Sequence, residues 1–444
     1  MAFSSRRRPL LPLLLDLLLG LNHLVGLGRL KDLLLVGLGL LVALLGASAP
    51  AAAQTPSLSA QSRISLITIL PGDPVYTFAG HSAVRVRDPA QNLDRLYNYG
   101  TFDFGDPLFI PKFTYGHLRY HLSVAPTGPV LDVYERQGRP VVEQPLNLTR
   151  AQRSRVAQFL RVNARPENRY YQYDFFFDNC STRIRDVLET TLGDSVRFAG
   201  GPPPQASFRE LLDPYVASRP WMDLGFDLAL GRPADRTPTR REQMFLPEHL
   251  LQGFEEATVV GPNGQRPLVA RTDTVLWVSD YDAMTPAFDW PFALSLGGLL
   301  LALGWTGWQG ARRRRPDGRG DALLLVGVGT VGLVACYLWF VSTYTVTDAN
   351  LNLLWAWPTH LWGAYLLLRH PSAPRTRYYL TAAAVGSLLF AAGWPLWPQN
   401  FHRAVLPVAL TVALRAGGWA LLLHGGVPRA WALQSVTVPD GPHR

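Results

Sequence analysis

Residues 173–186 read Tyr-Asp-Phe-Phe-Phe-Asp-Asn-Cys-Ser-Thr-Arg-Ile-Arg-Asp and place Cys180 directly before a predicted helix. This helix is expected to end near Leu192, and Ser181 and Thr182 are potential capping residues at its start. A helix N-terminus offers unpaired amides and partial positive charge, and both favour a thiolate. Cys180 is therefore a candidate nucleophile. The alternative is a small buried residue beside three phenylalanines.

A cysteine nucleophile needs a base, and His81 begins a stretch, residues 81–87, whose alternation predicts a strand. If residues 96–101 form the adjacent antiparallel strand, Asn98 is the candidate to orient the imidazole. Asp178, two positions before the cysteine, is the next choice for this third role. The pattern predicts a Cys180–His81–Asn98 site.

His117 and His121 are rival bases. Their spacing of four would also suit a metal ion, but no other ligand cluster lies near them, and we expect neither a metal nor another cofactor. Tyr99, Asp178 and Arg183 flank the predicted catalytic residues and are further candidates, for contacts with the substrate.

The segment around these residues has the composition of a soluble α+β domain. A strand is expected at residues 64–70, and Thr149 is a good N-cap for an amphipathic helix over residues 149–162. Further helices are expected near residues 208–216 and 248–256, and a hairpin across residues 262–264. Strands first and helices interspersed later indicate an α+β fold.

Residues 1–53 resemble an export signal. A basic start at Arg29 and Lys31 is followed by a short apolar run, residues 33–45, and then by small residues with several possible cleavage points. The alternative is an uncleaved N-terminal helix. In both cases we expect the next segment, residues 54–289, to be translocated across the membrane.

Five apolar stretches follow this segment, each long enough to span a bilayer. They are residues 290–308, 322–342, 351–368, 379–397 and 405–424. The loops at residues 309–321 and 369–377 contain five and three arginines, whereas the alternate loops contain none and one. By the positive-inside bias the arginine loops are cytoplasmic. We therefore expect a periplasmic domain (54–289), a five-helix transmembrane bundle (290–426) and a cytoplasmic tail (427–444) in the inner membrane of a Gram-negative-type envelope.

The composition agrees with a membrane protein, because hydrophobic residues make up 48% and charged residues only 17%. The formal charge of +9 gives no sign of nucleic-acid binding, since the densest basic run, Arg312 to Arg315, lies between two apolar stretches. Cys336 lies inside an apolar run, which leaves Cys180 without a partner in the exported domain. Arg415 interrupts the last apolar stretch, where it either snorkels or forms a pair within the bundle.

Three segments together, residues 79–86, 97–104 and 168–186, resemble the periplasmic domain of Lnb-type lipoprotein N-acyltransferases. The similarity extends over most of residues 60–285 and continues in the membrane part at Asn350-Leu351-Asn352-Leu353-Leu354-Trp355. The order of histidine, polar residue and helix-borne cysteine also resembles the permuted papain-like enzymes, in which the cysteine carries an acyl group as a thioester.

The resemblance implies a permuted papain-like, NlpC-like catalytic domain in which Cys180 is the nucleophile, His81 the base and Asn98 the orienting residue. It implies acyl transfer from a phospholipid to the N-terminal amine of a diacylglyceryl lipoprotein at the inner membrane. Asn98 is the loosest match, because relatives often carry histidine there. Two alternatives remain: a Cys-His hydrolase acting on lipid or murein, and a non-catalytic membrane scaffold in which Cys180 is buried.

Overall fold

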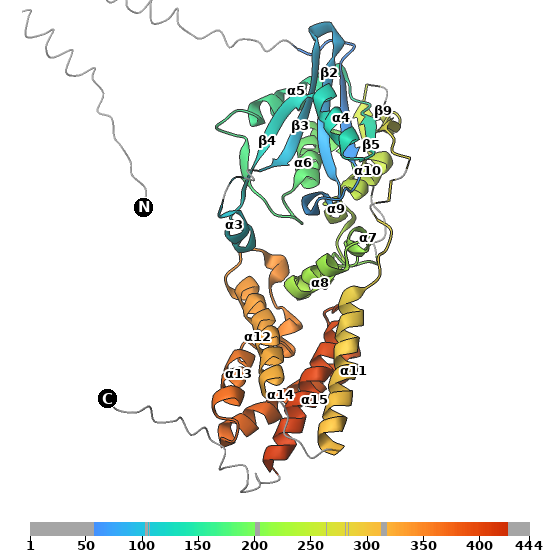
Figure 1. Cartoon of the computed structure of the whole chain (residues 1–444). Coiled ribbons are helices and arrows are strands. Elements are labelled where there is room, and N and C mark those ends of the chain that lie inside the picture. Colours follow the sequence, from blue (N-terminus) through green and yellow to red (C-terminus); the bar gives the residue numbers. More distant parts are fainter. Residues whose placement is uncertain are drawn as a thin grey trace, which may run out of the picture. The chain divides into compact units, whose positions relative to one another are not determined.

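The computed structural model describes residues 57–102, 105, 107–199, 205–262, 264–279, 281–282, 284–311 and 318–424. The predicted signal, the cytoplasmic tail and Arg312 to Arg315 lie outside these ranges. Within them, a mixed sheet-and-helix domain is followed by a helical membrane region (Figure 1).

An antiparallel sheet of seven strands forms the centre of the first domain, in the order β10-β5-β1-β2-β3-β4-β6. The strands are β1 Arg63–Ile69, β2 His81–Asp88, β3 Leu93–Thr101, β4 Arg119–Pro126, β5 Val141–Pro145, β6 Tyr170–Gln172 and β10 Asp273–Leu276. The predicted neighbours β2 and β3 do pair, from Val84–Tyr97 to Asp88–Leu93. A second, three-stranded sheet contains β7 Val196–Arg197, β8 Thr258–Gly261 and β9 Gly264–Pro267.

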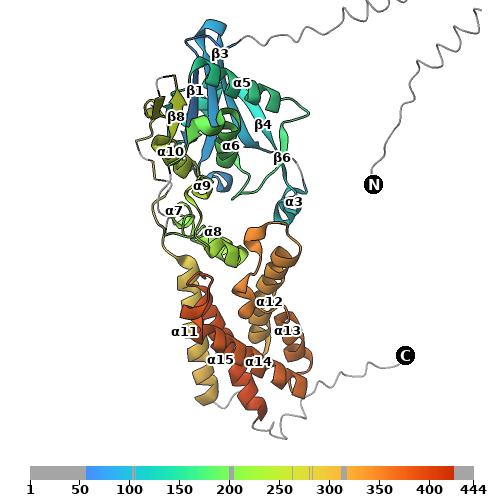
Figure 2. The ribbon, with the colours of Figure 1, turned by 180° about the vertical axis from the view of Figure 1, so that it is seen from behind.

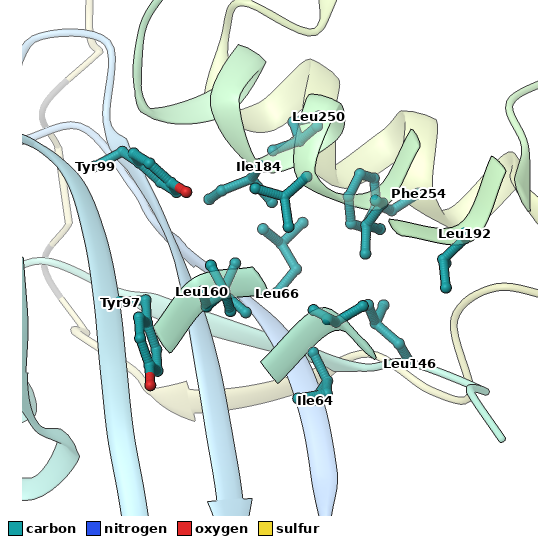
Figure 3. Packing of buried hydrophobic residues seen from close by; sticks show 14 of the residues in the cluster. Ile64, Leu66, Tyr97, Tyr99, Leu146, Leu160, Ile184, Leu192, Leu250 and Phe254 are labelled. Atoms are coloured by element: carbon teal, nitrogen blue, oxygen red, sulfur yellow. The ribbon is translucent and has the colours of Figure 1, made fainter. Parts of the chain in front are cut away.

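Period-two alternation divides the sheet residues between two cores. One face carries Leu66, Val84 and Tyr97 against α5 Arg150–Asn163, α6 Cys180–Leu192 and α10 Pro247–Glu256. Figure 3 shows Leu66 of this face among side chains of the three helices. The opposite face carries Ile67, Ile69 and Ala83 against α4 Thr127–Arg136. Figure 2 shows α5 and α6 from the other side of the sheet. The sheet is therefore covered by helices on both faces.

Local signals account for the two helices nearest the site. Thr149 caps α5 through a capping box with Gln152, as predicted. The cap of α6 is Asn179, one residue before Cys180, and not Ser181 or Thr182. The remaining elements of the first domain are short: α3 Phe109–Tyr115, α7 Asp213–Val216, α8 Pro220–Ala229 and α9 Arg240–Gln243. The helix expected over residues 208–216 is thus limited to the single turn of α7.

The membrane region contains α11 Trp290–Ala311, α12 Gly318–Phe340, α13 His360–Arg369, α14 Pro374–Ala392 and α15 Val405–His424. Within the described ranges, three helices have the length and composition of membrane spans: Trp290–Ala311, Gly318–Phe340 and Val405–Leu423. Five spans are therefore not confirmed. The stretch at 351–368 is not one helix, because a 3₁₀ turn at Leu351–Leu354 and an irregular segment with Pro358 precede α13. The 10 residues of α13 extend only about 15 Å.

Arg415 forms a pair within the bundle. Its guanidinium donates two hydrogen bonds to the Asp321 carboxylate, at 2.6 and 2.9 Å, and further bonds to Thr306 Oγ1 and Gln309 Oε1. The indole nitrogen of Trp419 donates to the same carboxylate. Snorkelling is therefore not required, and the ion pair joins α12 to α15.

Helix α8 depends on the membrane region for its C-terminal cap. A helix leaves its last carbonyls without intrahelical donors. The amide of Asn350 donates to the carbonyls of Leu228 and Ala229, Asn352 donates to that of Asp227, and Gln399 to that of Leu230. The conspicuous Asn-Leu-Asn motif at residues 350–352 is therefore used at the junction between the two regions.

Candidate functional site

Cys180 is the first residue of α6, and its position depends on the preceding residue. Asn179 Oδ1 accepts from the amides of Ser181 and Thr182, both at 2.9 Å, and its Nδ2 donates to the carbonyls of Phe175 and Phe245. All four bonds are made by one buried side chain. They fix the start of the helix, and with it the direction of the thiol.

A second contact attaches this helix end to β2. The hydroxyls of Ser82 and Ser181 lie 3.0 Å apart and are buried. Ser82 follows His81 in β2, and Ser181 follows Cys180 in α6. A hydrogen bond between these neighbours therefore brings the cysteine and the histidine together, although 99 residues separate them.

The thiol lies where the β2–β3 ladder has ended. The last paired residues are Val84 and Tyr97, and beyond them the Ser82 amide hydrogen-bonds the Cys180 sulfur. From the other side, a Cβ built on Gly100 would lie 3.7 Å from Cys180 Cβ, and the φ of Gly100 is +89°. Glycine thus suits a position where the backbone is left-handed and approaches the cysteine.

The surroundings lower the pKa of the Cys180 thiol below its usual value. Burial acts in the opposite direction, but the charge and hydrogen bond of His81 outweigh it, with help from the Ser82 amide and the Ser181 hydroxyl. The Ser181 oxygen is 3.9 Å from the sulfur. The surroundings of Cys180 therefore favour the thiolate form more than burial alone would.

Asn98 lies in β3, on the same sheet face as His81 by the pairing register. Its Oδ1 is buried and has no hydrogen-bond partner, so the expected bond from His81 is not formed in this structure. A buried carbonyl oxygen without a donor costs free energy. Asn98 thus provides an unused acceptor near the histidine.

The three further candidates have different surroundings. Tyr99 is only 1% exposed, and its hydroxyl donates to Asn163 Oδ1, so it belongs to the core and has no surface for a substrate. Asp178 is bound to Arg183, whose guanidinium lies over the Tyr171 ring at 4.0 Å. Asp178 is therefore engaged in an ion pair, which makes it a poor replacement for Asn98.

The rival histidines have other surroundings. His117 lines an open hollow of about 390 Å³ with Arg119, Tyr170, Tyr171 and Gln172. His121 is in β4, where burial and the charge of Arg169 lower its pKa. Across the part of the chain that the structure describes, no three His, Cys, Asp or Glu side chains are grouped to hold a metal ion.

Tyr171 is a further residue near the site, and it was not among the candidates that the sequence singled out. It is 8% exposed, and no group of the described residues accepts the proton of its buried hydroxyl. Burial raises the pKa of this hydroxyl well above its usual range, and the charge of Cys180 adds to the effect. Tyr171 therefore keeps its proton and can donate it, while the Gly100 amide lies at its oxygen; only its place on a short strand after a basic segment distinguishes it in the sequence.

Comparison with known proteins gives two family matches. The family model of the Lnb N-terminal periplasmic domain matches residues 52–213, and that of the Lnb transmembrane domain matches residues 283–424. No curated protein and no solved structure matches the chain. Two domains of one family thus occur in order along the chain. The protein belongs to the Lnb family, and this membership implies a membrane enzyme of the lipoprotein N-acyltransferase type.

Proposed function

We propose that the protein transfers a fatty acyl chain from a phospholipid to the N-terminal amine of a diacylglyceryl lipoprotein, through a thioester on Cys180. The observation that carries the proposal is the thiol at the start of α6, with its pKa lowered by His81. Family membership supports the reaction class. The permuted papain-like arrangement belongs to the same proposal, since histidine, asparagine and cysteine follow in that order.

In the first half-reaction the thiolate attacks the ester carbonyl, and an S–C bond forms. The C–O bond then breaks, and the imidazolium of His81 donates its proton to the departing alcohol oxygen of the lysophospholipid. In the second half-reaction the neutral amine attacks the thioester. An N–C bond forms, the S–C bond breaks, and His81 accepts the amine proton while the thiolate is restored.

Two donors are proposed for the oxyanion. One is the Cys180 amide, among the four that a helix leaves without an intrahelical acceptor. The other is the Tyr171 hydroxyl, whose proton no group accepts. Asn98 Oδ1 is proposed to accept from the imidazole when the substrate is bound, because catalytic hydrogen bonds often tighten only in the complex.

The test uses the purified full-length protein in phospholipid vesicles. Mass spectrometry of the intact protein is expected to find an acyl adduct on Cys180 that neutral hydroxylamine removes. A diacylglyceryl lipopeptide should then gain the acyl chain at its amine. Cys180→Ser should form no thioester. Free fatty acid without acylated lipopeptide would instead indicate the hydrolase, and the absence of any adduct would indicate the scaffold.

Complementation gives the corresponding test in cells. The gene should restore N-acylated lipoproteins to a strain that lacks its own lipoprotein N-acyltransferase. The Cys180→Ser variant should be inserted at the same level and should fail to do so. Complementation by that variant would remove the covalent mechanism.

A further inference from the structure

Helix α3 lies against the outer end of α12, although more than 200 residues separate them. The Thr343 amide donates to the Tyr115 carbonyl at 3.0 Å, and the hydroxyls of Thr114 and Tyr337 lie 3.4 Å apart. Tyr337 is within the last turn of α12, one of the three membrane-span helices. Helix α3 is therefore level with the end of a membrane span.

The contact at this point is tight. A Cβ on Gly116, which ends α3, would lie 2.2 Å from Thr343 Oγ1, and the φ of Gly116 is +86°. Only glycine permits this approach without displacement of one of the two segments. The position of α3 beside α12 is thus built into the backbone.

The rest of α3 exposes large apolar side chains. Leu108, at the helix start, is 56% exposed, Ile110 is 64% exposed and Phe113 is 37% exposed. We call these three residues the α3 patch. Apolar side chains exposed together mark an interaction surface. Beside the end of a membrane span, the apolar medium available to them is the outer leaflet of the bilayer.

A continuous row of aromatic rings leads from this patch into the domain. Centroid distances along it are 6.1 Å for Phe113–Phe109, 5.2 Å for Phe109–Phe102, 5.0 Å for Phe102–Tyr120 and 4.1 Å for Tyr120–Tyr173. We call these five residues the aromatic row. The first three distances are typical of interacting rings, and Tyr120 and Tyr173 are stacked at a shorter distance.

The aromatic row passes the nucleophile. Phe102 is two residues beyond Gly100, whose Cα faces Cys180 Cβ, so it is about 7 Å further along the chain. Phe102, Tyr173 and Cys180 pack against the same core cluster. The row therefore connects the membrane surface with the surroundings of the thiol.

We propose that the α3 patch lies in the outer leaflet and that the aromatic row receives the acyl chain of the donor phospholipid, guiding its ester to Cys180. This inference rests on the proposed function. An extended polypeptide would need backbone donors and acceptors along its path, whereas the aromatic row offers apolar ring faces over most of its length. An acyl chain needs only such an apolar surface.

The experiment compares two acyl donors on the full-length protein in vesicles. One donor is a dipalmitoyl phospholipid, and the other is p-nitrophenyl acetate, which is soluble and has no chain to guide. The rate of Cys180 thioester formation is measured with each. Ile110→Asp and Phe102→Ala are each expected to lower the ratio of the phospholipid rate to the acetate rate roughly tenfold, since several buried methylenes lose their contacts. The acetate rate also reports whether each variant is folded.

Val260→Asp is the matched control. Val260 is 41% exposed in β8 and belongs to neither the patch nor the row, so both rates should equal those of the wild type. A parallel fall of both rates in Ile110→Asp and Phe102→Ala, or no change in their ratio, would overturn the inference. If the wild-type protein forms no thioester with either donor, the proposed function fails, and this inference fails with it.

Discussion

At the scale of single residues, the reactivity of Cys180 depends on the pKa of its thiol and on the neighbours that shift this pKa. Burial alone would keep the thiol protonated, and His81 reverses that preference. The opposing effects of burial and His81 determine the pKa of the thiol in the free protein, so this pKa can be tested without substrate.

The first prediction concerns the pH dependence of the thiol. In a Cys336→Ala background, alkylation of Cys180 by iodoacetamide should rise with a midpoint below the usual thiol pKa of 9.0. His81→Ala removes the positive charge that stabilises the thiolate and leaves the opposing effect of burial. The midpoint should therefore move to higher pH. The same midpoint in both proteins would show that His81 does not act on the thiol.

The second prediction compares two buried tyrosines, Tyr171 and Tyr99. Loss of the first hydroxyl should lower the rate of thioester formation, and loss of the second should lower the free energy of unfolding. Tyr171→Phe removes an uncommitted hydroxyl, so the free energy of unfolding should stay the same or rise by up to about 1 kcal/mol. Thioester formation should nevertheless fall roughly 10²- to 10³-fold, as for a lost oxyanion donor.

Tyr99→Phe is the matched control for this substitution. It breaks the bond to Asn163 and should cost about 1 kcal/mol, while the rate per folded molecule stays unchanged. The measurements are thermal unfolding and thioester formation on the same samples. A Tyr171→Phe protein with the wild-type rate would exclude the tyrosine from the oxyanion site.

At the scale of the element, Asn179 links the stability of α6 to the geometry of Cys180, the proposed nucleophile. Asn179→Ala removes the cap and leaves two buried carbonyls without their donor, so it should cost at least about 2 kcal/mol. It should also lower the thioester rate per folded molecule, because Cys180 is the next residue.

Thr149→Ala in α5 provides the comparison. It removes a similar capping box and should cost about 1 kcal/mol. The thioester rate per folded molecule should remain unchanged, since α5 does not carry Cys180. Equal effects of the two variants on the rate would mean that the cap of α6 has no catalytic importance.

Local signals in the sequence were sufficient for the elements that follow local rules. The alternation after His81 and the Thr149 cap predicted β2 and α5 because both are properties of neighbouring residues. The third apolar stretch was wrong as one helix because apolar content alone ignores Pro358. Asn350 and Asn352 precede α13 and are bonded to α8 instead. No property of a single segment could have predicted that contact.

In the candidate site, too, local sequence signals predicted some features, whereas others depend on contacts between distant segments. Cys180 and His81 were singled out by their positions relative to a helix start and a strand start. The free hydroxyl of Tyr171 could not be predicted, because it depends on the absence of an acceptor in the assembled core. The role of Asn98 remains a prediction, since its oxygen is close to the histidine face but unbonded.

At the scale of the whole molecule, orientation in the membrane decides whether the site meets its substrates. A reporter fused after Gly318 should indicate the cytoplasm, and one fused after Thr347 should indicate the periplasm. The expectation follows from the arginines of the two loops and is measured with a pair of compartment-specific enzymes. Exchanged results would place Cys180 on the cytoplasmic side and remove the proposed reaction.

The membrane region should be sensitive to loss of its buried ion pair. Arg415→Met leaves the Asp321 carboxylate buried without its main partner and should cost about 3 to 5 kcal/mol in detergent unfolding measurements. Asp321→Leu added to the same chain should restore much of the loss, because no uncompensated charge remains. A double variant as unstable as the single one would contradict this account.

The capping of α8 by residues of the membrane region has a consequence for the order of events during synthesis. The carbonyl of Leu228 receives its donor from Asn350, 122 residues later; that of Leu230 is bonded by Arg209 of the same domain and receives a second donor from Gln399, 169 residues later. At ordinary rates of translation, the longer interval lasts roughly 10 to 30 s. During this time the first domain has already left the ribosome, while the end of α8 still lacks the donors that the membrane region supplies. The C-terminal cap of α8 is therefore complete only after the last part of the membrane region has been made, and a prematurely terminated chain leaves this helix end without some of its donors.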